Sequence, residues 1–81
     1  MTKATIGRTV IYKTTPEDRE KMGKHPACNV VFDLPAVIVN TWNEDIGLVN
    51  LKVICDGEPD LWKTSIKQGD SEGEWNWPVI S

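Results

Sequence analysis

The sequence has few of the residues on which catalytic and metal sites depend. Its 81 residues include one histidine, His25, and two cysteines, Cys28 and Cys55. A structural zinc site usually takes four Cys or His ligands, so a carboxylate would have to complete the set. His25 and Cys28 lie three positions apart, but Pro26 opposes the helical geometry that would make them a nucleophile and its base. We therefore predict no metal, no cofactor and no enzymatic activity.

Phosphate-binding glycine loops and long apolar runs are also missing. Neither GxGxxG nor GxxxxGK[ST] occurs. No run approaches eighteen apolar residues, and the start, MTKATIGRTV, lacks the apolar region of a signal peptide. We expect an intracellular protein that does not enter a membrane and keeps its cysteines reduced. Cys55 is expected to be a small buried hydrophobic residue.

Basic residues are few and scattered, with nine Lys and Arg against twelve Asp and Glu, for a net charge of −3. Nucleic acid is an unlikely partner because binding it usually needs a clustered basic surface. A few basic side chains in one pocket could still hold a small phosphate ligand. Five of the twelve acidic residues cluster at two turns, and we interpret these five as turn-forming and solvated. They are Glu44, Asp45, Asp56, Glu58 and Asp60.

A period-two alternation from Leu48 to Ile66 is the strongest structural signal in the chain. One side of its first half is apolar, and Asp56-Gly57 begins a turn into a second alternating segment. We predict a hairpin that buries Trp62 together with the apolar side of the first strand. That side consists of Val49, Leu51, Val53 and Cys55.

Three further segments read as strands, namely Thr5–Lys13, Pro35–Trp42 and Glu74–Val79. Five antiparallel strands with one long first connection indicate a small all-β, SH3-like barrel. An OB-type barrel is the alternative. We expect a single β-barrel domain over residues 1–81, and homo-oligomers are possible because so small a core often needs added stabilisation.

The long connection, Thr14–Leu34, has the signals of a short helix. Thr15 suits the N-cap, Pro16 the first helical position, and Gly23 the end of the helix. The apolar run Ala27–Phe32 fits either a short edge strand or a packed loop. Connections of this length often carry ligand or partner contacts.

Four tryptophans in 81 residues are the most distinctive feature of the composition. Trp75 and Trp77 could pack the barrel end, form a subunit interface or stack on a ligand ring. We expect any pocket where Thr14–Leu34 meets Glu74–Val79, or otherwise between subunits. The candidate ligand-binding residues are Trp75, Trp77 and Trp42 for stacking or apolar contact, and Arg8, Tyr12 and Lys63 for polar or phosphate contact.

Five strings of residues follow one another along the predicted strands. They are IGRTVIY, PAVIVNTW, LVNLKVICDG, LWKTSI and GEWNWP. The ordered set resembles a widespread family of small uncharacterised bacteriophage proteins that end in Gly-x-Trp-x-Trp-Pro. The resemblance covers most of the chain outside Pro16–Leu34.

The resemblance implies a phage or prophage origin, expression in the host bacterial cytoplasm, and a small β-barrel. It suggests a non-catalytic anti-defence protein that captures a host defence protein or a small nucleotide-like immune signal. The alternative is a virion-associated or assembly protein with a structural role.

Overall fold

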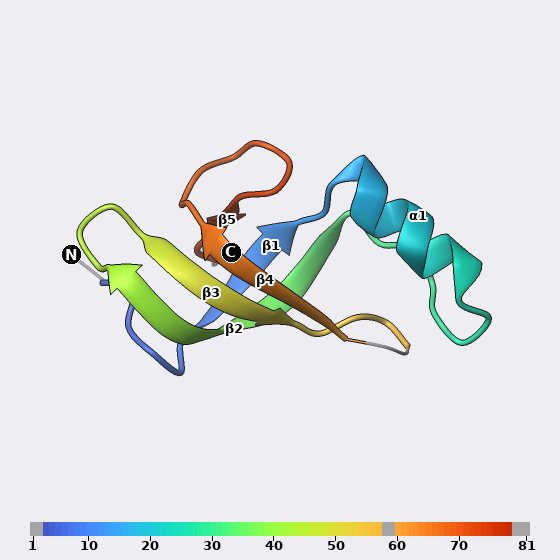
Figure 1. The fold of residues 1–81 in the computed structure, drawn as a ribbon, viewed down its shortest axis with the longest axis horizontal. Helices are drawn as coiled ribbons and strands as arrows, with labels where there is room; N and C mark the ends of the chain where they lie inside the picture. Colours follow the sequence, from blue (N-terminus) through green and yellow to red (C-terminus); the bar gives the residue numbers. More distant parts are fainter. Residues whose placement is uncertain (1–2, 58–59, 79–81) are drawn as a thin grey trace.

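The alternating segments form five strands, and the proline-headed segment after the first of them forms a helix (Figure 1). The computed structural model describes residues 3–57 and 60–78. The elements are β1 (Thr9–Lys13), α1 (Pro16–Lys24), β2 (Asp33–Asn43), β3 (Leu48–Val53), β4 (Leu61–Ile66) and β5 (Trp75–Asn76).

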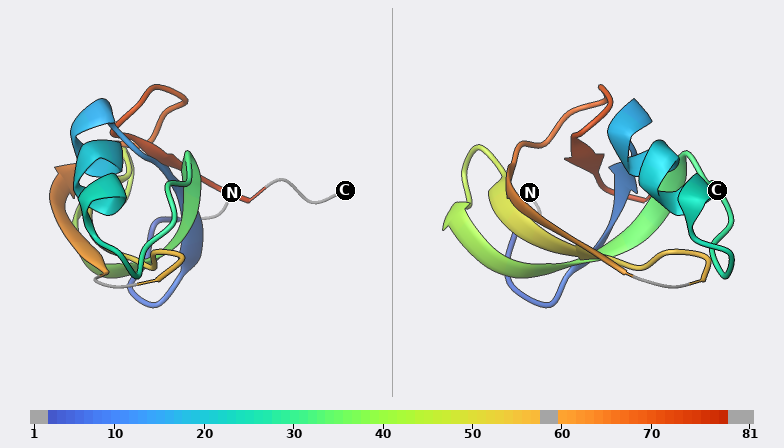
Figure 2. Two further views of the ribbon diagram at one scale, coloured as in Figure 1. Left: turned by 90° about the vertical axis from the view of Figure 1, so that its right-hand side faces the viewer. Right: turned by 45° about the vertical axis from the view of Figure 1, so that its right-hand side comes forward.

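The strands form one antiparallel sheet in the order β4-β3-β2-β1-β5. The all-β fold class is therefore confirmed, with the long first connection that the sequence predicted. Figure 2 shows the sheet curling around the core. Among the described residues, β4 and β5, the two edges of the sheet, are not paired as strands; Gln68, two residues after β4, forms an isolated bridge with Trp75 of β5. Closure into a barrel is therefore not confirmed.

The concave side of the sheet holds the core. Val49, Leu51 and Val53 are fully buried there and Cys55 nearly so, as their alternation predicted. The other buried apolar side chains are Ala4, Val10, Tyr12, Met22, Leu34, Ala36, Ile38 and Trp75. Trp75 and Tyr12 are the largest side chains that the core encloses completely.

The helix begins as predicted but ends one residue later. The Thr15 side chain accepts a hydrogen bond from the Asp18 amide, the Asp18 side chain accepts one from the Thr15 amide, and Pro16 opens the helix. The predicted stop at Gly23 is wrong, because the helix continues to Lys24. His25 then takes an extended conformation before Pro26, where a helical one would clash with the proline ring.

Two segments differ from expectation near the strand ends, and a third settles between two expected alternatives. Thr5–Arg8 forms a turn, with Gly7 at φ +93°, so β1 starts later than predicted. Ala27–Phe32 is a loop and not an edge strand: Cys28 and Val31 pack against the core, and Cys28 forms an isolated bridge with Gly57. The last strand is short, and Val79 lies outside the described residues.

The prediction that Trp62 belongs to the core is wrong. In the register of β3 and β4, Leu61 pairs with Val53 and Lys63 with Leu51, on the buried side. Trp62 pairs with Lys52 on the opposite side of the sheet and is 60% exposed. The sequence correctly predicted that residues of β4 alternate between the two sides of the sheet. It assigned Trp62 to the buried side, where Leu61 and Lys63 lie instead.

Candidate functional site

Two of the candidate polar contacts, Tyr12 and Lys63, belong to an internal network around Asp18. Asp18 lies on α1 and is 1% exposed. Its carboxylate accepts hydrogen bonds from the Tyr12 hydroxyl at 2.6 Å, the Thr15 amide at 3.0 Å and the Lys63 ammonium. This network attaches the helix to β1 and β4. The assignment of Tyr12 and Lys63 as ligand contacts is therefore corrected, because Tyr12 is buried and the Lys63 ammonium binds Asp18.

The electrostatics of the network agree with this structural role. Burial alone would raise the pKa of Asp18, but hydrogen bonds from Lys63, Tyr12 and the Thr15 amide lower it below its ordinary value. Burial, the hydrogen bond to Asp18 and the nearby negative charge together raise the pKa of Tyr12. An ionised Asp18 beside a neutral Tyr12 hydroxyl is thus the stable state.

Trp75 is also a core residue and not a ligand contact. Its ring is fully buried, and its indole nitrogen donates to the Gly47 carbonyl at 2.8 Å. Gly47 has φ +72°, and a Cβ there would lie 3.0 Å from the Trp75 ring. Trp75 therefore links β5 to the turn between β2 and β3, and the expectation that it stacks on a ligand is corrected.

Trp77 and Arg8 are more accessible to solvent than Trp75 and Tyr12, and each contacts a different part of the protein. Trp77 is half-buried, with its ring edge-on to Trp75 at 5.0 Å between centroids. Arg8 is exposed in the turn before β1, where its amide donates to the Thr5 carbonyl at 3.3 Å.

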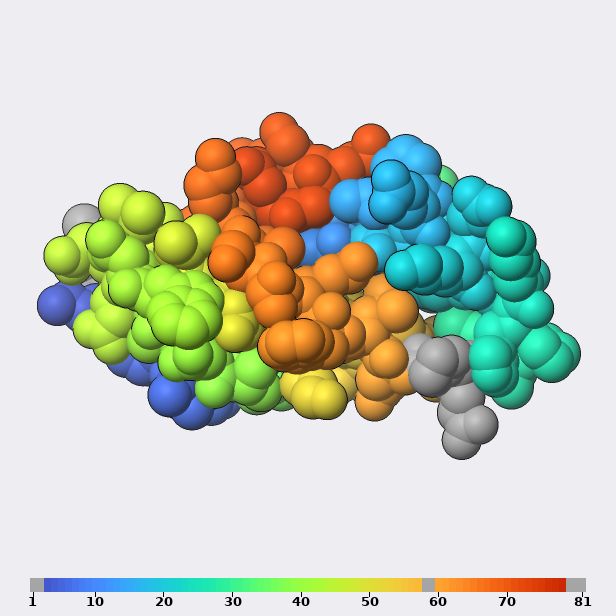
Figure 3. Space-filling view, viewed as in Figure 1, coloured from blue at the N-terminus to red at the C-terminus, as the bar shows by residue number. Residues whose placement is uncertain are grey.

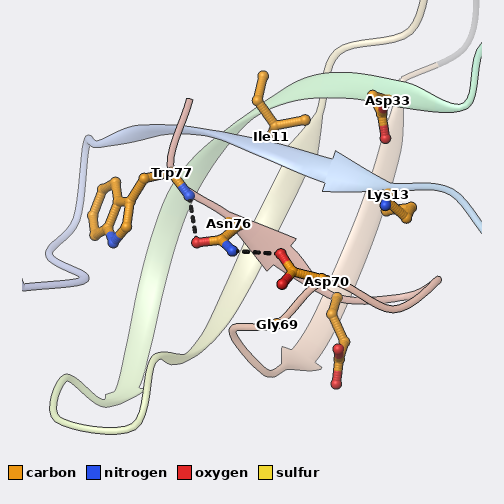
Figure 4. A pocket seen from close by; sticks show the side chains of 8 residues that line it. Ile11, Lys13, Asp33, Gly69, Asp70, Asn76 and Trp77 are labelled. Carbon is orange, nitrogen blue, oxygen red and sulfur yellow. Dashed lines mark hydrogen bonds between the residues drawn. The ribbon is translucent and has the colours of Figure 1, made fainter. Parts of the chain in front are cut away.

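A surface pocket lies beside Trp77, between the end of the long connection and the C-terminal segment (Figure 4). Its volume is about 190 Å³. Lys13 and Asp33 face each other across β1 and β2, and the Asn76 side chain donates to Asp70 at 2.8 Å. The lining residues are Ile11, Lys13, Asp33, Gly69, Asp70, Glu74, Asn76 and Trp77.

The charge of this pocket does not suit an anionic ligand. Three carboxylates, from Asp33, Asp70 and Glu74, share the wall with one ammonium from Lys13. Phosphate groups would meet net negative potential there. The volume is also below the roughly 300 Å³ at which sites for drug-sized ligands begin. The pocket includes residues of the predicted Glu74–Val79 segment but only Asp33 of Thr14–Leu34, and its chemistry does not favour a nucleotide.

The convex side of the sheet carries a second candidate site. Two bulges occur in β2: from Ile38 to Asn40 the strand advances two residues while β3 advances one, and the same happens from Thr41 to Asn43. The extra residues are Val39 and Trp42, and both are exposed. Bulges of this kind re-aim side chains and interrupt regular alternation.

These residues join others on the outside of β3 and β4. Trp62 lies across from Lys52, and Ile54 follows Lys52 by two residues. Trp42 and Trp62 are each 60% exposed, and Ile54 is 45% exposed. We call Val39, Trp42, Lys52, Ile54 and Trp62 the tryptophan face. Figure 3 views the molecule from the side on which β4 lies in front, where β2 to β4 (green to orange) form a continuous surface.

Asn50 holds Trp42 in place on this face. Its side-chain oxygen accepts hydrogen bonds from the Trp42 indole nitrogen and from the Ser65 amide, both at 2.9 Å. Ser65 sits in a bulge of β4 and has φ +54°, which leaves its amide without a regular ladder partner. Asn50 is itself 7% exposed. One buried side chain therefore closes the bulge and orients an exposed tryptophan.

Sequence reasoning missed Asp18, Asn50 and the exposure of Trp62. Asp18 was missed because its partners lie on β1 and β4, far from it in the sequence or in another element. An asparagine on an otherwise apolar strand was a usable signal for Asn50, since buried amides need partners.

Candidate metal ligands and the pair His25 and Cys28 were located in the described part of the chain. There, no three side chains of the types His, Cys, Asp and Glu gather in a way that could hold a metal ion. His25 and Cys28 line the same cavity, but the His25 ring accepts from the Ala27 amide at 3.3 Å and the Cys28 thiol donates to the Asn29 carbonyl at 3.5 Å.

Comparisons with known proteins gave no matching family model, no similar curated protein and no similar solved structure. Within the described residues, the helix is too short and too polar to cross a membrane.

Proposed function

We propose that this protein is a non-catalytic binding protein of bacteriophage origin that captures a host defence protein through the tryptophan face. The observation that carries the proposal is the pair Trp42 and Trp62, each 60% exposed on the convex side of one sheet. Tryptophan is the residue type most enriched among those that dominate binding energy at protein interfaces.

The tryptophan face has properties that favour tight protein contact. Trp42 is oriented by Asn50, so less side-chain freedom is lost when a partner binds it. Trp62 is anchored in a paired strand. Rigid aromatic side chains supply large contact area at low entropic cost.

Lys52 indicates the chemistry of the partner. It pairs with Val37 on one side and with Trp62 on the other, so it lies among apolar side chains. The face therefore carries a positive charge on a chain whose net charge is −3. A partner segment that places apolar side chains around one carboxylate would complement it. A second copy of this chain fits less well, since a symmetric contact centred on this face would bring two Lys52 side chains together.

The choice of a protein over a nucleotide-like signal rests on where the candidate residues lie. Trp75 and Tyr12 are buried, Lys63 binds Asp18, and the pocket beside Trp77 is lined mainly by carboxylates. No cluster of basic side chains lines either described cavity for phosphate groups to occupy.

The test begins with capture of partners from a lysate of the host bacterium on the immobilised protein. Any partner is then purified, and its affinity is measured by isothermal titration against the wild type and two variants. Trp62→Ala is expected to weaken binding about 30-fold or more, as for a residue that dominates an interface. Phe32→Ala is the matched control: Phe32 is 63% exposed but lies against Arg19 beside the helix, and affinity should be unchanged.

Three outcomes would contradict the proposal. Equal affinity of the wild type and Trp62→Ala would place the interface elsewhere. Stoichiometric amounts of the protein in purified phage particles, measured by mass spectrometry, would favour the structural alternative. Heat on titration with cyclic nucleotides or single-stranded oligonucleotides, lost in Trp62→Ala, would assign the face to base stacking.

A further inference from the structure

The segments that carry the two cysteines, distant in sequence, lie side by side just beyond the end of β3. The loop after α1 runs antiparallel to the segment that follows β3, and Cys28 forms a bridge with Gly57. The Asn29 amide donates to the Asp56 carbonyl at 3.0 Å, and the Asn29 side chain donates to the Asp56 carboxylate at 3.0 Å. Backbone and side-chain hydrogen bonds thus hold the loop against the segment that follows β3.

Gly57 allows an unusually close approach of the two segments. A Cβ at this position would lie 1.9 Å from the Ala27 carbonyl oxygen and 2.6 Å from the Cys28 Cα. Both are backbone atoms, so no side-chain rotation could relieve the clash. Because Gly57 has no side chain, the backbone at Cys28 can lie directly against the segment that follows β3.

Cys28 lies opposite Gly57, two residues after Cys55, and the two cysteines differ in exposure. Cys55 is 7% exposed, and Cys28 is half-buried and packs against the same hydrophobic cluster. Burial raises the pKa of the Cys55 thiol, and the adjoining Cys28 thiol and the Asp60 carboxylate raise it further. Cys28 also lines a cavity of about 170 Å³, together with Lys21, Met22, His25 and Leu61, which opens it to small reagents.

We propose that Cys28 and Cys55 are a modification site, where a peroxide converts the two thiols into an intramolecular disulfide. The Cys28 sulfur attacks one oxygen of hydrogen peroxide, the O–O bond breaks, and a sulfenic acid and water form. The Cys55 sulfur then attacks the Cys28 sulfur, and the second oxygen leaves as water. In total, two thiols and one peroxide give one disulfide and two waters, with two electrons passing from sulfur to oxygen.

The disulfide would fasten the long loop to the end of β3. Such a crosslink constrains the unfolded chain, so the oxidised protein is more stable than the reduced one. Neither cysteine belongs to the tryptophan face, and the proposed disulfide does not rest on the function proposed for that face.

The experiment treats the whole protein with hydrogen peroxide, blocks free thiols with N-ethylmaleimide in denaturant, and measures intact mass. The expected product has lost two hydrogens, carries no maleimide and is monomeric, and peptide mapping joins Cys28 to Cys55. Dithiothreitol should restore two maleimide-reactive thiols. The melting temperature of the oxidised protein should rise by roughly 5–15 °C, and the Cys28→Ser variant should show no rise.

Two glycine variants test the geometry. Gly57→Ala should slow disulfide formation because the loop is displaced from the end of β3. Gly23→Ala is the matched control: a Cβ there meets only a Val30 methyl group at an ordinary 3.6 Å, so the rate should equal that of the wild type. Wild-type protein that keeps two reactive thiols, forms only intermolecular dimers or accumulates sulfinic acid on Cys28 would overturn the proposal.

Discussion

The two sides of the sheet use tryptophan in opposite ways. On the concave side, Trp75 is fully buried and its indole nitrogen donates to the Gly47 carbonyl. On the convex side, Trp42 is mostly exposed, yet its indole nitrogen also has a protein acceptor, the Asn50 side chain. A satisfied indole N–H is therefore no indication of burial.

The difference lies in what each hydrogen bond accomplishes. The bond from Trp75 fixes a core side chain against the turn between β2 and β3 and contributes to stability. The bond from Trp42 orients a ring that packs little against its own chain. An exposed side chain that is held in one orientation is what a binding surface needs, so the comparison separates residues of the fold from residues of the proposed interface.

The largest expected effect is on the concave side. Trp75→Ala removes the largest fully enclosed side chain and leaves the Gly47 carbonyl without its donor. We expect a loss of about 3–5 kcal/mol of unfolding free energy, which leaves little of the stability of a domain this small. Urea denaturation followed by circular dichroism measures it. A loss under about 1 kcal/mol would show that Trp75 is not part of the core.

The buried network around Asp18 gives the next largest effect. Asp18→Asn leaves the Lys63 ammonium without a charged partner and removes one acceptor site for the Tyr12 hydroxyl or the Thr15 amide. We expect a loss of about 2–4 kcal/mol in urea denaturation. The control Glu17→Gln, exposed on the same helix, should cost at most about 0.5 kcal/mol. Equal effects of the two substitutions would mean that the helix is not held by Asp18.

The same network predicts how stability depends on pH. Folding lowers the pKa of Asp18, so its contribution is complete above the ordinary Asp pKa of about 3.9 and is lost as pH falls through the folded value. Folding raises the pKa of Tyr12, so its contribution is complete below about pH 10 and is lost as pH rises through the folded value.

Melting temperatures across the pH range measure both limits. Asp18→Asn should flatten the acid decline, and Tyr12→Phe should flatten the alkaline one. An acid decline that is equally steep in Asp18→Asn would assign it to other carboxylates.

On the convex side, the Asn50→Ala variant tests the support beneath Trp42. It leaves the Trp42 indole and the Ser65 amide without an acceptor. We expect a loss of about 1–2 kcal/mol, together with a shift of the Trp42 indole N–H resonance in NMR spectra. Thr64→Ala, an exposed change on the neighbouring strand, serves as the control. An unshifted indole resonance would show that Asn50 does not orient the ring.

The smallest effect on stability is expected from Trp62→Ala. Because Trp62 is 60% exposed, its removal should change the unfolding free energy by about 0.5 kcal/mol or less. The same variant is expected to lose partner binding, so stability and binding should separate at this residue. A loss above about 2 kcal/mol would mean that Trp62 packs into the fold after all.

Much of the fold could be predicted because its signals are local. The alternation of Val49, Leu51 and Val53 identified the buried side of β3, and Thr15-Pro16 identified the start of the helix. These features depend on neighbours within a few residues along the chain. The candidate site was predicted less well, because Tyr12 and Lys63 were assigned without knowledge of Asp18, their common partner.

The exposed tryptophans show where local reasoning ends. On β4, both Leu61 and Trp62 are apolar, so alternation alone could not decide which of them faces the core. The register with β3 decided it, by pairing Leu61 with Val53 and Trp62 with Lys52. On β2, the bulges at Val39 and Trp42 interrupted the alternation and turned extra apolar side chains outward.

By itself, the sequence determined the strand segments, the helix start and the buried side of β3, since hydrophobic period and capping chemistry act over short stretches. Only the tertiary structure decided which tryptophans are core and which are surface, where the Asp18 network forms, and that Cys28 meets Cys55. The physical reason is that register, bulges and the close approach at Gly57 arise from pairing between distant segments.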